Sequence, residues 1–149
     1  MSMVDGVNLG LLGKNQEDLK IISAYLQDSV LIIKDTVFLK QNRTFVMIVN
    51  RFMWEDVEKG VFRQNKRIRC AVKFDEVIKV ESKNINQKKK NKPLECLAIK
   101  CNQIFNETYK IKIFFAGDSI ITIISEVIDV ALHDLGKPWS VKHIPIHKI

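Results

Sequence analysis

The chain has 149 residues, of which 46% are hydrophobic and 28% are charged, and its formal net charge is +7. This length suits one domain with one sizeable core, so we expect residues 1–149 to form a single domain. The composition, with only six Gly and three Pro, excludes a disordered, collagen-like or membrane-spanning chain.

The positive charge is concentrated in the middle of the chain. Residues 61–112 hold fourteen Lys and Arg against five Asp and Glu. Such a segment is typical of proteins that bind nucleic acid, an anionic membrane surface or an acidic protein. Because only five of the 24 basic residues are Arg, the Lys-rich codon bias of an AT-rich genome is an alternative source of this charge.

The three cysteines are Cys70, Cys96 and Cys101, and they form no C-x-x-C pair. This odd number argues against a disulfide framework and against a zinc site, so we expect reduced, packed thiols. The N-terminus lacks the basic and apolar regions of a signal peptide, and no apolar stretch is uninterrupted enough to span a membrane. We therefore expect a cytoplasmic bacterial protein with no metal, no cofactor and no insertion into the membrane.

The first expected elements are a packed arm over residues 1–13 and a helix. Asn15 can cap the free amides at the start of this helix, and acidic residues follow it in the first turn. Three apolar residues then recur at helical spacing: Leu19, Ile22 and Leu26. The pattern predicts a helix from Asn15 to about Asp28.

From Val30 to Ile124 the apolar pattern has a period of two, which predicts strands. Short polar breaks divide this region into seven segments: 30–34, 36–40, 44–54, 68–82 with a bend near Asp75-Glu76, 94–101, 109–115 and 119–124. The breaks at 41–43 and 116–118 are short enough to require antiparallel hairpins.

A second helix is expected after the last strand. Ser125 is a candidate cap, and Gly136 followed by Pro138 is a typical stop signal. The expected inward face consists of Val127, Val130, Ala131 and Leu135. Beyond this helix we expect Trp139 to pack back onto the domain and residues 140–149 to form an extended tail.

Together these elements predict an α+β domain: an antiparallel sheet or roll of about seven strands with an N-terminal and a C-terminal helix. This element count is that of a pleckstrin-homology-like roll. A helix-backed antiparallel sheet of another topology has the same count.

Several short motifs, in this order and spacing, resemble a small alphaproteobacterial family known as domain of unknown function 2948. They are Leu26-Gln27-Asp28 with Val30, Asn50-Arg51-Phe52 with Trp54-Glu55, Phe74-Asp75 with Val77, Leu97-Ala98-Ile99, Phe115-Ala116-Gly117, and Asp134-Leu135-Gly136 with Pro138-Trp139. The resemblance covers roughly residues 15–147 and implies a single bacterial intracellular domain, but it contributes no catalytic residue. The lysine run at 88–92 is peculiar to this sequence, which counts against its being the functional site.

Five residues are candidates for a binding surface: Arg51, Trp54, Glu55, Trp139 and His147. An Arg beside an aromatic ring and a carboxylate can hold an anionic ligand or anchor a partner protein. The alternative is structural, with Trp54 closing the end of the core and Arg51 paired with an acidic residue.

A second candidate site is basic and would contact nucleic acid or another anion. Its members are Arg63, Lys66, Arg67, Arg69, Lys88, Lys89, Lys90 and Lys92, which form one surface if their loops share an end of the sheet. The alternative is a solvated loop, because Phe74 is the only aromatic residue between Arg63 and Lys92.

No catalytic residues are identified, because the chain has no G-x-S-x-G nucleophile motif and Pro145 prevents His143 and His147 from sharing a helical face.

We therefore expect a small non-catalytic binding or adaptor module that takes another protein or a small ligand. The alternative is a weak, non-specific binder of nucleic acid or an anionic surface through residues 61–112. A third possibility is an enzyme without a recognisable motif. A continuous basic face would favour the alternative, and scattered lysines would favour the adaptor.

Overall fold

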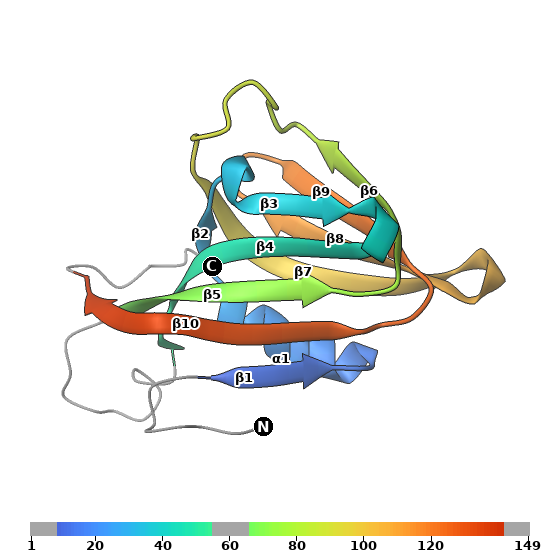
Figure 1. Ribbon diagram of the computed structural model, residues 1–149, viewed down its shortest axis with the longest axis horizontal. Coiled ribbons are helices and arrows are strands. Elements are labelled where there is room, and N and C mark those ends of the chain that lie inside the picture. The colour runs from blue at the N-terminus through green and yellow to red at the C-terminus, as the bar shows by residue number, and fades with distance from the viewer. Residues whose placement is uncertain (1–8, 55–65, 142–149) are drawn as a thin grey trace.

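The structure is a computed structural model that describes residues 9–54 and 66–141, and these contain one α-helix and ten β-strands (Figure 1). The strands are β1 Gly10–Gly13, β2 Val30–Leu31, β3 Thr36–Leu39, β4 Thr44–Phe52, β5 Lys66–Phe74, β6 Val77–Lys83, β7 Leu94–Ile104, β8 Thr108–Phe115, β9 Ser119–Ser125 and β10 Val130–Ser140. The helix is α1 Gln16–Leu26, and three short 3-10 helices are η1 Ile33–Asp35, η2 Lys40–Asn42 and η3 Phe105–Glu107.

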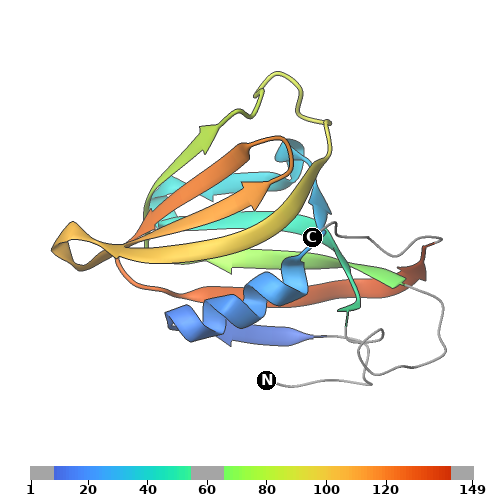
Figure 2. The same ribbon diagram turned by 180° about the vertical axis from the view of Figure 1, so that it is seen from behind.

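All strand pairs are antiparallel, and the strands follow the order β1-β10-β5-β4-β2-β7-β8-β9-β6, with β3 also paired to β4. The two-residue strand β2 joins two halves of the sheet. Its Val30 pairs with Asn50 of β4 and with Glu95 of β7. The sheet curves at this junction, so the first half (β1, β10, β5, β4, β3) lies across from the second half (β7, β8, β9, β6), as Figures 1 and 2 show.

Helix α1 lies along one side of this roll, between β1 and β7 (Figure 2). Asn15 caps it as predicted, because its side-chain Oδ1 accepts from the amide of Asp18 at 2.8 Å. The three residues of the expected apolar face are buried: Leu19, Ile22 and Leu26. The backbone amide of Ile99 donates to the Ser23 hydroxyl at 2.9 Å, which fixes the helix to β7.

One apolar cluster joins the two halves. Burial alternates along the strands, as in β9, where the even-numbered residues are half-buried and the odd-numbered ones are buried. The alternation means that each strand turns one set of side chains into the core and the other set outward. The expected antiparallel sheet is confirmed, but the count of seven strands is wrong.

The predicted C-terminal helix is also wrong, since residues 130–140 form strand β10. This strand pairs with β5 on one side and β1 on the other. Its buried residues are Val130, Leu132 and Asp134, with a period of two, whereas Leu135 is exposed. Gly136, with φ of +68°, does not end a helix but lies in an irregularity of the β10–β5 register. Pairing with two neighbours has overridden the local helical spacing.

Two further differences, together with β10, account for the three strands that the sequence pattern did not predict. The expected arm contains strand β1, and the long segment 68–82 is broken at Asp75-Glu76 into β5 and β6. Glu76 has a φ of +56°, which turns the chain out of the first half of the sheet and into the edge of the second half. At the bend expected here, the chain therefore passes from the first half of the sheet to the second.

No helix within residues 9–54 and 66–141 is long and apolar enough to cross a membrane.

Candidate functional site

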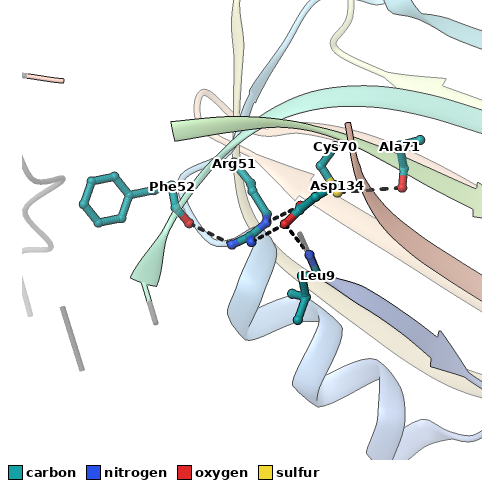
Figure 3. Close-up of polar contacts among 6 residues, drawn as sticks. All are labelled: Leu9, Arg51, Phe52, Cys70, Ala71 and Asp134. Atoms are coloured by element: carbon teal, nitrogen blue, oxygen red, sulfur yellow. Dashed lines mark hydrogen bonds and ion pairs between the residues drawn. The ribbon is translucent and has the colours of Figure 1, made fainter. Parts of the chain in front are cut away.

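Arg51 forms a fully buried ion pair with Asp134 (Figure 3). Its Nε donates to Asp134 Oδ1 and its Nη2 donates to Asp134 Oδ2, both at 2.7 Å. Asp134 Oδ2 also accepts from the amide of Leu9 at 2.9 Å, and the Arg51 guanidinium lies 5.7 Å from the ring centre of Tyr25. The bidentate pair fastens β4 to β10 and the first described residue of the chain. Arg51 thus has the structural role that the sequence left open and presents no charge to the surface.

Trp54 lies at the end of β4, against helix α1. Its indole Nε1 donates to the carbonyl of Gln27 at 2.9 Å, and its ring meets that of Phe52 edge-on with centres 4.6 Å apart. The ring lines a groove of about 400 Å³ on the outer side of α1, together with Glu17, Lys20, Ile21, Ala24 and Tyr25. Trp54 is therefore hydrogen-bonded to the residue that ends α1 and also lines an open groove.

Of the other candidates for this surface, Glu55 and His147 lie outside the described residues. Trp139 is on β10, opposite Arg67 of β5, and 40% of its surface is exposed. It is thus less deeply packed than we expected. Among the residues that the structure describes, no group of three or more His, Cys, Asp or Glu side chains is placed to hold a metal ion.

The predicted basic site is divided between β5 and the loop after β6. Arg63 lies outside the described residues, and Lys66 begins β5. Arg67 donates from Nη1 to the carbonyls of Asp28 (3.0 Å) and Asn50 (3.1 Å), and partial burial lowers the pKa of its guanidinium despite the nearby carboxylate charges. The charge of Arg67 is thus directed at the protein's own backbone.

The rest of this predicted site lies around η1. Arg69 Nη2 is 3.8 Å from Asp35 Oδ2, and the amide of Lys34 donates to the carbonyl of Lys90 at 3.2 Å. The loop lysines are all exposed: Lys88, Lys89, Lys90 and Lys92. Arg69 and the loop therefore both contact the same short helix.

A different basic surface lies on the outer side of the second half of the sheet. The register places three rows of side chains across β7, β8, β9 and β6: Ala98, Phe114, Ile120 and Lys83; Lys100, Lys112, Thr122 and Glu81; Asn102, Lys110, Ile124 and Lys79. Directly opposed residues share one face of a sheet, and the residues between these rows include the buried Ile111, Ile113, Ile121 and Ile123. These rows therefore point outward. We call the five lysines of the rows the lysine face: Lys79, Lys83, Lys100, Lys110 and Lys112.

The lysine face includes one acidic neighbour, Glu81. Its Oε1 is 2.6 Å from Lys79 Nζ, and this hydrogen bond, together with the charges of Lys79 and Lys110, lowers the pKa of Glu81. Adjacent strands are about 4.8 Å apart and the rows about 7 Å apart. Lys100 and Lys110 each lie within a Debye length of about 8 Å of Lys112, so the fields of these three lysines add, whereas Lys83 lies farther away, at the edge of the face.

The sequence contained only part of the signal for this surface. Lys110 and Lys112 alternate with apolar residues in the predicted strand 109–115. The other members come from β6 and β7, and only the strand order brings them beside β8 and β9. Sequence proximity instead pointed to the lysine run of the loop.

The buried thiols provide a first testable prediction. Cys70 lies inside the sheet with Ile68, Val72 and Phe74, as alternation predicted, and Cys96 is also buried. Burial raises the pKa of both thiols to about 12, and for Cys70 the charge of Asp134 adds to this effect. Because the thiolate is the reactive species, a disulfide reagent should modify Cys101, which is partly exposed, well before the other two. Mass spectrometry of the labelled native protein checks the order, and rapid modification of Cys70 would contradict the register of β5.

The same thiols give a pH dependence. An unfolded thiol ionises near pH 9, whereas the folded Cys70 and Cys96 stay protonated to about 12. Their contribution to stability is thus fully present below pH 9 and is lost as the pH rises toward 12. Urea unfolding across this range should show a smaller fall in stability for Cys70→Ser than for the parent chain.

A family model with the description "Protein of unknown function (DUF2948)" matches residues 9–147. Neither the curated proteins nor the solved structures gave a match. The matched region includes every described strand and helix α1, and so the whole lysine face.

Proposed function

The chain belongs to the DUF2948 family of proteins of unknown function, and from its geometry we propose a non-catalytic binding module whose lysine face holds a polyanion. The observation that carries the proposal is the register of β6, β9, β8 and β7. It gathers five lysines and one glutamate on one continuous face. A continuous face of this kind favours a basic binding surface over lysines scattered by codon bias.

The chemistry of the face suits a ligand with repeated negative charges. A lysine ammonium is a compact point charge with three donors, and it binds phosphate without demanding one geometry. Strand pairing holds the backbone of β8 on both sides, and that of β6 and of β7 at Lys100 on one side, so the spacing of these lysines is set by the sheet before a ligand arrives. A polyanion that spans the rows would release its bound counterions, which favours association at low salt.

The test compares two variants that each remove four positive charges. One replaces Lys79, Lys100, Lys110 and Lys112 by Gln, and the other replaces the loop residues Lys88, Lys89, Lys90 and Lys92 by Gln. We expect the parent to bind a labelled oligonucleotide or polyphosphate, with an affinity that falls steeply as salt rises. The first variant should bind at least about tenfold more weakly, and its salt slope should be smaller by about 0.7–0.9 for each phosphate that it no longer neutralises. Fluorescence anisotropy over a salt series measures both quantities.

The loop variant is the matched control. It should retain the affinity of the parent, and its stability should change by less than about 0.5 kcal/mol because all four side chains are exposed. An equal or larger loss of binding in the loop variant would move the site to the loop. No binding of any polyanion at low salt would overturn the proposal.

A second candidate function is the protein-binding adaptor expected from the sequence. The groove on α1 favours it, because Tyr25 and Trp54 line that groove beside Ile21, which is 52% exposed. Aromatic residues of this kind are frequent anchors in protein interfaces. Failure of the polyanion test would leave this groove as the leading site.

A further inference from the structure

An uncharged strip lies between the lysines of the lysine face. The outward side chains of β9 are Ile120, Thr122 and Ile124, and Phe114 of β8 lies directly opposite Ile120. All four are half-buried, so each leaves part of its surface open to solvent. Lysines flank the strip on both sides, from β6 on one edge and from β8 and β7 on the other.

We infer that the polyanion is single-stranded nucleic acid, an inference that rests on the proposed function. In a single strand the bases are free to turn toward a protein while the phosphates remain at the sides. The strip provides surfaces for the bases, and the flanking lysines provide charges for the phosphates. Lys100 Nζ lies over the face of the Phe114 ring, 5.7 Å from its centre, so a phosphate that draws this ammonium aside would uncover the ring for the adjoining base.

A second aromatic residue lies at the end of the same hairpin that carries Phe114. Phe105 lies in η3 at the tip of the β7–β8 hairpin, beyond the pair of Ile104 and Thr108 that follows the row of Asn102 and Lys110, and is 90% exposed. An aromatic ring with so little contact inside the protein contributes little to the fold. Base stacking on an aromatic ring does not depend on the base sequence of the nucleic acid. This agrees with the chemistry of the lysine face, whose lysines would bind phosphates and would not read the edges of bases.

The two other phosphate-rich partners fit less well. A duplex keeps its bases stacked inside, so it would cover the apolar strip with charged backbone and gain nothing from it. A peripheral membrane protein needs apolar groups that reach about 5–10 Å into the lipid, whereas the strip is half-buried between longer lysines. The hairpin tip does protrude, but among the described side chains Phe105 is the one exposed large hydrophobic residue there, which is little apolar surface for insertion into lipid.

The experiment uses the full chain and three probes. They are a labelled single strand of about 12 nucleotides, the duplex of the same sequence, and vesicles of phosphatidylcholine with phosphatidylglycerol. At equal salt we expect the single strand to bind about tenfold more tightly than the duplex. Phe105→Ala and Phe114→Leu should each weaken single-strand binding several-fold and leave duplex binding unchanged. Leu12→Ala, which changes an exposed side chain on β1, is the control and should bind like the parent.

The outcomes separate this inference from the proposed function. In one outcome the single strand and the duplex bind equally, the four-lysine variant abolishes this binding, and the two Phe variants leave it unchanged. This outcome would retain the lysine face as a polyanion site and overturn the single-strand inference. Vesicle binding that depends on Phe105, without binding of the single strand, would also overturn it and assign the face to a membrane. No binding of any probe would overturn both.

Discussion

Replacing Asp134 by Ala is expected to lower the free energy of unfolding by about 3–5 kcal/mol, the range for breaking a buried ion pair. The guanidinium of Arg51 would keep its charge at a position with 0% exposure and lose both of its 2.7 Å bonds to the carboxylate. The amide of Leu9 would lose its acceptor as well. A loss of this size is a large part of the roughly 5–15 kcal/mol that holds an ordinary domain together. Urea unfolding followed by circular dichroism measures it.

Two further variants show whether buried charge is the cause. The double substitution Arg51→Met with Asp134→Leu removes the pair as a whole and should recover most of the lost stability. Asp129→Ala removes the surface partner of Lys14, 2.6 Å away, and should cost less than about 1 kcal/mol. Two results would show that Arg51 and Asp134 do not act as one buried unit. One is that Asp134→Ala lowers the stability no more than Asp129→Ala does, and the other is that the double variant is no more stable than Asp134→Ala.

The buried pair explains why Arg51 was ambiguous in the sequence. An Arg near an aromatic residue and a carboxylate suits both a surface that binds anions and an internal ion pair. Only burial separates the two, and burial here depends on Asp134, which is 83 positions away along the chain. The local neighbours Trp54 and Glu55 contained no information about that partner.

Elements stabilised by local signals were predicted well. The cap at Asn15 and the helical spacing of Leu19, Ile22 and Leu26 depend on residues within one helix, and helix α1 forms as expected. Most of the seven strand segments appear at nearly the predicted bounds, because alternation within a strand is also local. The lysine face could not be predicted, since it depends on the neighbours that each strand takes in the sheet.

Strand β10 shows how a single buried ion pair changes the apparent period of a segment. Val130 and Leu132 alternate correctly for a strand, but the next inward position is Asp134, whose carboxylate suggests an outward residue. Without knowledge of Arg51, the apolar residues of 127–135 fit a helical face better than a strand. The pairing of β10 with both β1 and β5 then decides the conformation.

Leu132→Ala is therefore expected to cost about 2–5 kcal/mol, and Leu135→Ala less than about 1 kcal/mol. In β10 the side chain of Leu132 is 0% exposed and belongs to the core cluster, whereas Leu135 is 37% exposed on the opposite face. A helix over the same residues would put Leu135 inside. The two substitutions remove the same atoms, so the difference between their free energies of unfolding reports burial alone. A larger loss for Leu135→Ala than for Leu132→Ala would contradict the strand and restore the helical interpretation of this segment.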